Sequence, residues 1–76
     1  MSKSWDKKNI KTFGKKVKEF RIIANISQAQ LAFECEIDVT QIARIERGEI
    51  NTGITNVFRI AKALDISPQV LFIFHK

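Results

Sequence analysis

The apolar residues of this chain recur at helical spacing in its first third. Between Asn9 and Ala24 they follow one another at steps of 3, 4, 3 and 4, at Ile10, Phe13, Val17, Phe20 and Ala24. Residues three and four apart share one face of an α-helix, so the pattern predicts an amphipathic helix. The stretch before it, residues 1–8, is polar and contains three lysines. We expect a basic N-terminal arm there and a folded domain over residues 9–76.

Two shorter helices with a tight turn between them are predicted from Ile26 to Gly48. Ser27 and Asp38 each precede a helical pattern and can cap it, because a side-chain oxygen accepts a hydrogen bond from a free backbone N–H. Gly48 suits the position after a helix, since glycine enters the left-handed region without a Cβ clash. Helices of roughly eight residues, separated by three or four, have the dimensions of a helix-turn-helix.

Two further helices are predicted in the last third of the chain. Thr55 is the expected N-cap of the first of them, which carries its core residues at helical spacing from Val57 to Leu64. Ser67 and Pro68 then favour the start of a last helix that reaches about Phe74. The pattern therefore predicts an all-α fold of five helices without a strand.

The last predicted helix is too apolar to be buried by one small domain. Residues 70–74 are five consecutive apolar residues, and an exposed apolar patch usually marks an interface. We expect Leu71 and Phe74 to point inward. The predicted dimer contact consists of Val70, Phe72 and Ile73.

The central motif resembles a known family. The segments SQAQLA from Ser27 and TQIARIERGEIN from Thr40, with Ile37 between them, are similar to the Xre and Cro-repressor type of helix-turn-helix domain. Small members of this type include restriction–modification controller proteins. The resemblance implies a repressor-like domain that binds DNA. Glu36 departs from the pattern, because the family usually has Gly in this turn, and a positive φ there should cost Glu36 about 1 kcal/mol.

DNA recognition needs a helix that fits the major groove and bears polar side chains near its start. With its two isoleucines facing inward, the helix from Val39 to Arg47 presents Thr40, Gln41 and Arg44 outward. Arg44 is the strongest candidate for a base contact, because a guanidinium donates two hydrogen bonds to guanine O6 and N7. Val39 or the Thr40 methyl can pack on a thymine methyl, and Gln41 can read adenine or reach phosphate. Each also has the ordinary alternative of a solvated side chain.

The resemblance assigns further roles. It implies that Gln28 contacts phosphate and braces the recognition helix, and that the loop after Gly48 contacts phosphate. The expected phosphate-binding residues are Ser27, Gln28, Arg47, Asn51 and Thr52. It also implies an ion pair between Arg21 and Glu46 that ties the first long helix to the end of the recognition helix.

Composition agrees with a nucleic-acid partner and argues against several other classes. A net charge of +5 and a pI near 9.7 favour a polyanion, although many small proteins are basic. One Cys and one His allow neither an internal disulfide nor a multi-cysteine metal site, so no cofactor is expected. The sequence contains no catalytic cluster and no apolar run of about 18 residues. We expect a cytoplasmic protein that is not an enzyme.

These features predict a DNA-binding transcriptional regulator, either a Cro-like repressor or a restriction–modification controller. It would bind a palindromic operator in double-stranded DNA as a homodimer. One alternative is a helix-turn-helix antitoxin that binds a toxin. Another is a protein-interaction module without DNA binding. RNA polymerase is a further candidate partner.

Overall fold

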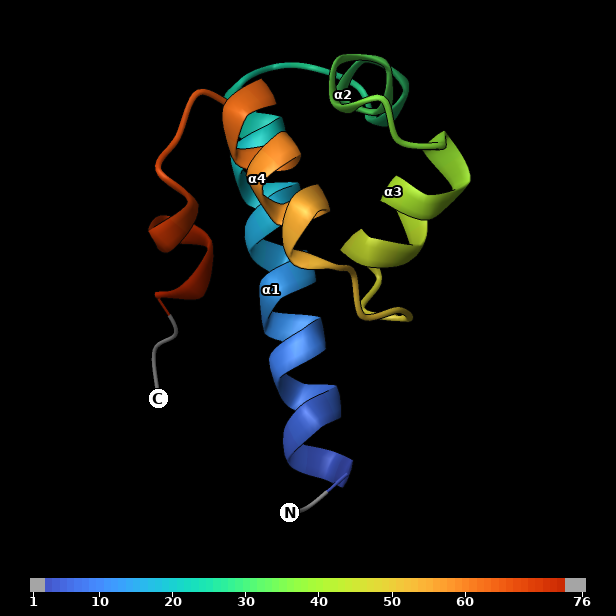
Figure 1. The fold of residues 1–76 in the computed structure, drawn as a ribbon, viewed down its shortest axis with the longest axis vertical. Helices are drawn as coiled ribbons and strands as arrows, with labels where there is room; N and C mark the ends of the chain where they lie inside the picture. The colour runs from blue at the N-terminus through green and yellow to red at the C-terminus, as the bar shows by residue number, and fades with distance from the viewer. Residues whose placement is uncertain (1–2, 74–76) are drawn as a thin grey trace.

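The computed structural model describes residues 3–73, and the side chains of residues 6–73. Its elements are α1 (Lys3–Ile23), α2 (Gln28–Cys35), α3 (Val39–Glu46), α4 (Ile54–Ala63) and the short 3₁₀ helix η1 (Pro68–Phe72) (Figure 1). The described residues contain no strand, in agreement with the predicted all-α class. None of these helices combines the length and the apolar character needed to span a membrane.

The expected number of five α-helices is wrong, because the described chain has four and the last segment is a 3₁₀ helix. Pro68 occupies its first turn as expected, but Ser67 makes no side-chain cap hydrogen bond. Its five residues bury only Leu71. Runs this short suit the tighter 3₁₀ geometry, which repeats every three residues. Phe74, the expected end of this helix, lies outside the described residues.

Helix α1 begins earlier than the apolar pattern suggested. It starts at Lys3 rather than near Asn9, so residues 3–8, expected as an arm, continue the helix. Asp6 lies in the first turn, where a negative charge suits the positive end of the helix dipole. The Thr12 hydroxyl donates to the Lys8 carbonyl at 2.9 Å. The first turns of α1 extend beyond the other elements (Figure 1).

The local signals of the helix-turn-helix are present in the structure. The Ser27 hydroxyl accepts from the Gln30 N–H at 3.0 Å, and the Asp38 carboxylate accepts from the Thr40 N–H at 2.7 Å. Glu36, in the turn, has a left-handed φ of 58°. Gly48, which follows the Arg47 C-cap of α3, has a left-handed φ of 73°. The expected Thr55 cap is wrong, because Gly53, two residues earlier, is the N-cap and α4 starts at Ile54.

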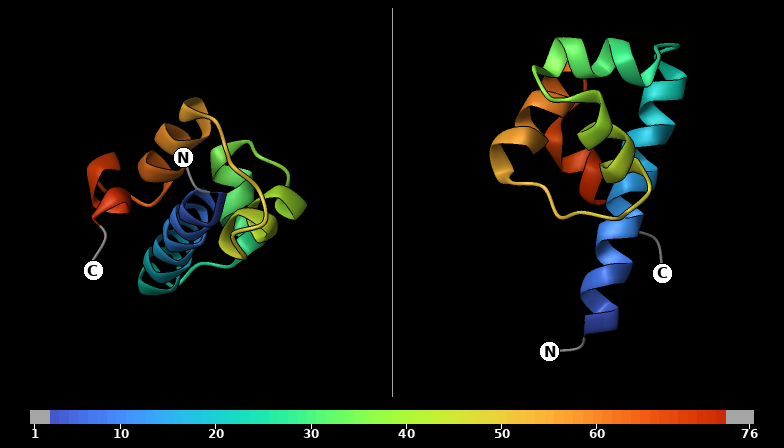
Figure 2. Two further views of the ribbon diagram at one scale, coloured as in Figure 1. Left: turned by 90° about the horizontal axis from the view of Figure 1, so that it is seen from below. Right: turned by 90° about the vertical axis from the view of Figure 1, so that its right-hand side faces the viewer.

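Helix α1 runs through the middle of the domain, with α2 and α3 on one side and η1 on the other (Figures 1 and 2). It packs against α3 and η1, while α2 packs against α3 and α4. The buried core draws on every element, and Leu71 is the contribution of η1, as expected. Its most enclosed large side chains are Val17, Leu31, Cys35, Ile42, Ile45, Ile60 and Leu71. This core fixes the position and rotation of α3.

Candidate nucleic-acid interface

Helix α3 has one buried and one exposed face. Ile42, Ile45 and Glu46 are buried and turn toward α1 and α2. Thr40, Gln41 and Arg44 are exposed, as the helical period predicts. The core therefore presents three polar side chains together on the outer face of a short helix.

An open groove lies beside this exposed face. Its volume is about 690 Å³, and the residues that line it are Asp38, Thr40, Gln41, Arg44, Ile50 and Asn51. Three of the four residues predicted to read bases thus share one surface with Asn51, one of the predicted phosphate ligands. Val39, the fourth, is 44% exposed at the start of α3 and does not line this groove.

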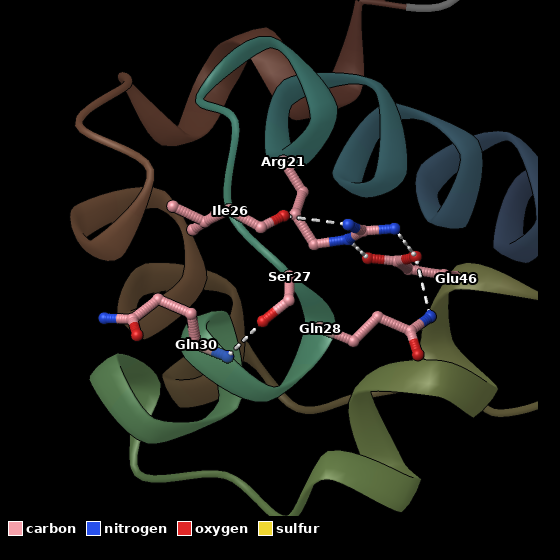
Figure 3. A network of polar contacts seen from close by, with 6 residues as sticks. All are labelled: Arg21, Ile26, Ser27, Gln28, Gln30 and Glu46. Atoms are coloured by element: carbon pink, nitrogen blue, oxygen red, sulfur yellow. Dashed lines mark hydrogen bonds and ion pairs between the residues drawn. The ribbon is translucent and has the colours of Figure 1, made fainter.

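Arg21 and Glu46 form a bidentate ion pair between α1 and the end of α3 (Figure 3). The Arg21 Nε lies 2.7 Å from Glu46 Oε2, and Nη2 lies 3.1 Å from Oε1. The third donor, Nη1, reaches the Ile26 carbonyl at 2.9 Å. The side chains are 13% and 2% exposed, so the pair is largely shielded from water.

Gln28 joins this ion pair from α2. Its Nε2 donates to Glu46 Oε1 at 3.0 Å (Figure 3). The Glu46 carboxylate therefore connects α1, the start of α2 and the end of α3. The brace that the resemblance implied is present as a hydrogen bond. The phosphate contact of Gln28 stays a prediction.

The other predicted phosphate ligands have different surroundings. The Ser27 hydroxyl caps α2, and Thr52 Oγ1 accepts from Asn56 Nδ2 at 2.9 Å. Each hydroxyl accepts in these bonds and keeps its own hydrogen to donate. Arg47 is exposed, but its guanidinium is held by Glu49.

Sequence reasoning missed Glu49. Its carboxylate accepts from Arg47 Nε at 2.6 Å and from Nη2 at 3.2 Å, and its Oε1 lies 3.7 Å from Arg44 Nε. The hydrogen bond from Arg47 lowers the pKa of Glu49 and raises that of Arg47. The sequence indicated the contact with Arg47, because Glu49 follows Arg47 by two residues with the Gly48 turn between them. Its contact with Arg44 depends on how that turn folds back.

A second surface is apolar and lies on α4 and η1. Phe72 and Ile73 are 50% and 52% exposed, as predicted, whereas Val70 is half-buried. The Phe72 ring also stacks on Phe13, with centroids 5.3 Å apart. A cavity of about 340 Å³ lies beside it and is lined mostly by apolar residues of α1, α4 and the loop before α4, including Ile10, Ile50, Ile54 and Val57.

Helix α4 adds two residues that the sequence reading did not assign to a contact. Ile54 and Phe58 are 67% and 55% exposed. They are four residues apart and so lie on one face of α4. The sequence did contain an indication of this exposed pair. Both are large apolar residues that fall outside the predicted core positions of α4, which begin at Val57.

Within residues 6–73, no three His, Cys, Asp or Glu side chains come together in a way that could hold a metal ion. Cys35 is a buried free thiol whose Sγ donates to the Arg59 carbonyl at 3.7 Å. Its place in the core agrees with the packing of a small apolar side chain.

Comparisons with known proteins agree with this geometry. A family model described as helix-turn-helix matches residues 17–71. The control protein C.BamHI of Bacillus amyloliquefaciens is 44% identical over 63 residues, which span 82% of this chain and 78% of that protein.

Two solved controller structures have the same fold. The restriction–modification controller protein C.AhdI from Aeromonas hydrophila superposes with a TM-score of 0.82 and 36% identity, over 83% of this chain and 96% of that one. The wild-type controller C.Esp1396I gives a TM-score of 0.77 and 30% identity, over 83% of each chain.

Proposed function

We propose that this chain, which belongs to the helix-turn-helix family of DNA-binding regulators, is the controller protein of a restriction–modification system. Its relatives C.BamHI and C.AhdI are named as control or controller proteins, and each matches most of this chain. A regulator of this kind would bind a twofold-symmetric operator as a homodimer.

The observation that carries the proposal is the outer face of α3. Thr40, Gln41 and Arg44 line an open groove, while a shielded ion pair fixes the end of the same helix. A helix held in this way can enter the major groove as a rigid body. Arg44 would then donate to guanine, Gln41 to adenine, and Thr40 and Val39 would pack against thymine methyl groups.

The surroundings of α3 supply candidate phosphate contacts. Ser27 and Gln28 lie at the start of α2, where backbone N–H groups and the helix dipole favour an anion. Asn51 and Thr52 lie in the loop before α4, and Asn51 lines the groove beside α3. Such contacts would set the register of α3 without reading sequence.

The proposed homodimer would use the apolar surface of Ile54, Phe58, Phe72 and Ile73. Two of these residues, Ile54 and Phe72, line the same apolar cavity, which supports a shared surface of α4 and η1. A second copy of the chain would cover this surface through a twofold contact, in which the same patch serves both partners. Contacts with RNA polymerase or with a toxin stay predictions.

Selection of bound duplexes from a random DNA pool tests the proposal. We expect an enriched site with twofold symmetry and half-sites about one helical turn apart. Affinity for it should fall steeply as salt rises, because binding to phosphates releases counterions. Enrichment of no sequence above background would contradict the proposed function.

A further inference from the structure

Glu49 lies between the two arginines expected to contact DNA. Its carboxylate holds Arg47 through two hydrogen bonds and places Oε1 3.7 Å from Arg44 Nε. All three side chains are about half exposed, at 46% for Glu49, 50% for Arg44 and 57% for Arg47. Arg44 lines the groove beside α3, so the negative charge of Glu49 lies next to the surface that DNA would approach.

The backbone fixes Glu49 at this point. Its N–H donates to the Arg44 carbonyl at 2.9 Å, and Gly48 turns the chain with a φ of 73°. Gly48 also lies close against Lys11 of α1, because a Cβ at Gly48 would come within 2.7 Å of the Lys11 Cα. The turn is held between α1 and α3, so the Glu49 carboxylate returns toward the two arginines.

The two arginines meet Glu49 in different ways. Arg47 uses Nε and one terminal amino group. Arg44 approaches through Nε, at a distance longer than a hydrogen bond. The ion pair with Glu49 thus leaves the two terminal amino groups of Arg44 for guanine O6 and N7. A side chain that is already oriented loses less conformational freedom when it binds.

We infer that Glu49 is a specificity-determining residue that positions Arg44 for base reading and weakens binding to DNA without the operator sequence. The inference rests on the proposed function, because it needs Arg44 to touch a base. On the operator, hydrogen bonds to a correctly placed guanine offset the cost of holding Arg44 in this orientation. On other DNA, the arginines meet only phosphate, and the Glu49 charge opposes that contact by repulsion.

Glu49→Gln removes this charge with little change in shape. The probes are the duplex selected from the random pool, its variants at the base pair contacted by Arg44, and a scrambled duplex of equal length. We expect discrimination at that base pair to fall about fivefold to tenfold, within the range that one base contact supplies. Binding to the scrambled duplex should rise by about threefold to tenfold, because the arginines attract the DNA phosphates more strongly once the opposing charge is gone.

Three controls separate the positioning of Arg44 from a general effect of charge and from a change in folding. Glu19→Gln changes net charge equally on an exposed part of α1 outside the groove, and should leave discrimination unchanged. In an Arg44→Ala background, Glu49→Gln should alter scrambled-duplex binding but not base choice. Helix content and the urea midpoint should match those of the original chain.

Unchanged discrimination in Glu49→Gln, with Arg44→Ala still relaxing base choice, would overturn the inference and leave the proposed function intact. Arg44→Ala with unchanged base choice would instead remove the premise that Arg44 reads a base. If Glu19→Gln reproduces the Glu49→Gln result, net charge alone is the cause and the inference is again wrong.

Discussion

Gly14 of α1 lies directly against the backbone of Ile45 near the end of α3. A Cβ built on Gly14 would come within 2.2 Å of the Ile45 carbonyl oxygen. Real Cβ atoms do not approach a carbonyl so closely, so this glycine permits α1 and α3 to pack at their observed separation. The rotation of α3 relative to the core depends on this contact and on the nearby ion pair of Arg21 with Glu46.

Gly14→Ala should therefore destabilise the fold. The clash is with backbone, which cannot rotate away, and we expect a loss of about 1–3 kcal/mol in the free energy of unfolding. Gly53→Ala is the matched control, since a Cβ there meets nothing within 4 Å. Because Ala is less favourable than Gly at the N-cap of α4, this change should cost about 0.5–1 kcal/mol, less than Gly14→Ala. Urea melts measure both, and a Gly14→Ala chain more stable than the original would contradict the close approach.

The Arg21–Glu46 pair should be strongly coupled. Glu46→Ala leaves a largely shielded guanidinium without its carboxylate, and we expect a loss of about 1–3 kcal/mol. The double change with Arg21→Ala should recover part of that loss. Urea melts of the four chains form a double-mutant cycle. The exposed Arg47–Glu49 pair is the comparison and should show much weaker coupling. Additive losses at Arg21 and Glu46 would show that the pair contributes no specific energy.

Raising the pH should destabilise the fold through Cys35. Burial, followed by the Glu34 charge, raises the pKa of this thiol from 9.0 to about 11, against the opposing charge of Arg59. The folded state holds the proton more tightly than the unfolded state, so its stability is unaffected below pH 9 and falls as the pH approaches 11. The test compares urea melts of the original chain and Cys35→Ala across this range. Parallel pH curves for the two chains would exclude the effect.

Local chemistry made much of the helix-turn-helix predictable. Ser27 and Asp38 cap their helices through neighbouring N–H groups, and Glu36 adopts the left-handed turn although it is not a glycine. These features depend on residues close in sequence. The Arg21–Glu46 pair was foreseen only through family resemblance, since 25 residues separate its members.

The features that the sequence did not predict depend on tertiary packing. Residues 68–72 form a 3₁₀ helix that buries Leu71, whereas the local pattern of Ser67 and Pro68 predicted only that a helix begins there. Glu49 meets Arg44 because the Gly48 turn folds back against α1. The exposure of Phe58 likewise depends on which face of α4 meets α2.

Arg44→Ala should weaken binding to the selected operator by about 1–3 kcal/mol and relax choice at one base pair in each half-site. Lys15→Ala, at an exposed position of α1, is the comparison for a contact with phosphate alone. If Lys15 touches phosphate, its loss should weaken all sequences alike and reduce the salt slope by about one. Titrations against single-base variants distinguish the two. Equal losses on specific and scrambled DNA for Arg44→Ala would show that Arg44 does not read a base.

The proposed dimer surface can be tested by substituting residues that the core does not need. Phe72 packs on Phe13, so replacing it would disturb folding as well as assembly. Phe58 and Ile73 are each about half exposed, at 55% and 52%, and are better targets. Burying a large apolar side chain is worth about 1.5–3 kcal/mol, so Phe58→Asp with Ile73→Asp should weaken dimerisation by about 100-fold or more.

Phe33→Asp is the control for this pair, because Phe33 is 81% exposed on α2 and lies outside the apolar surface of α4 and η1. Sedimentation at micromolar concentration should give a dimer for the original chain and for Phe33→Asp, and a monomer for the double change. Circular dichroism should show equal helix content in all three. The folded monomer would bind a half-site weakly, because the second recognition helix no longer adds its contacts. An original chain that stays monomeric at high micromolar concentration without DNA would rule out a preformed dimer.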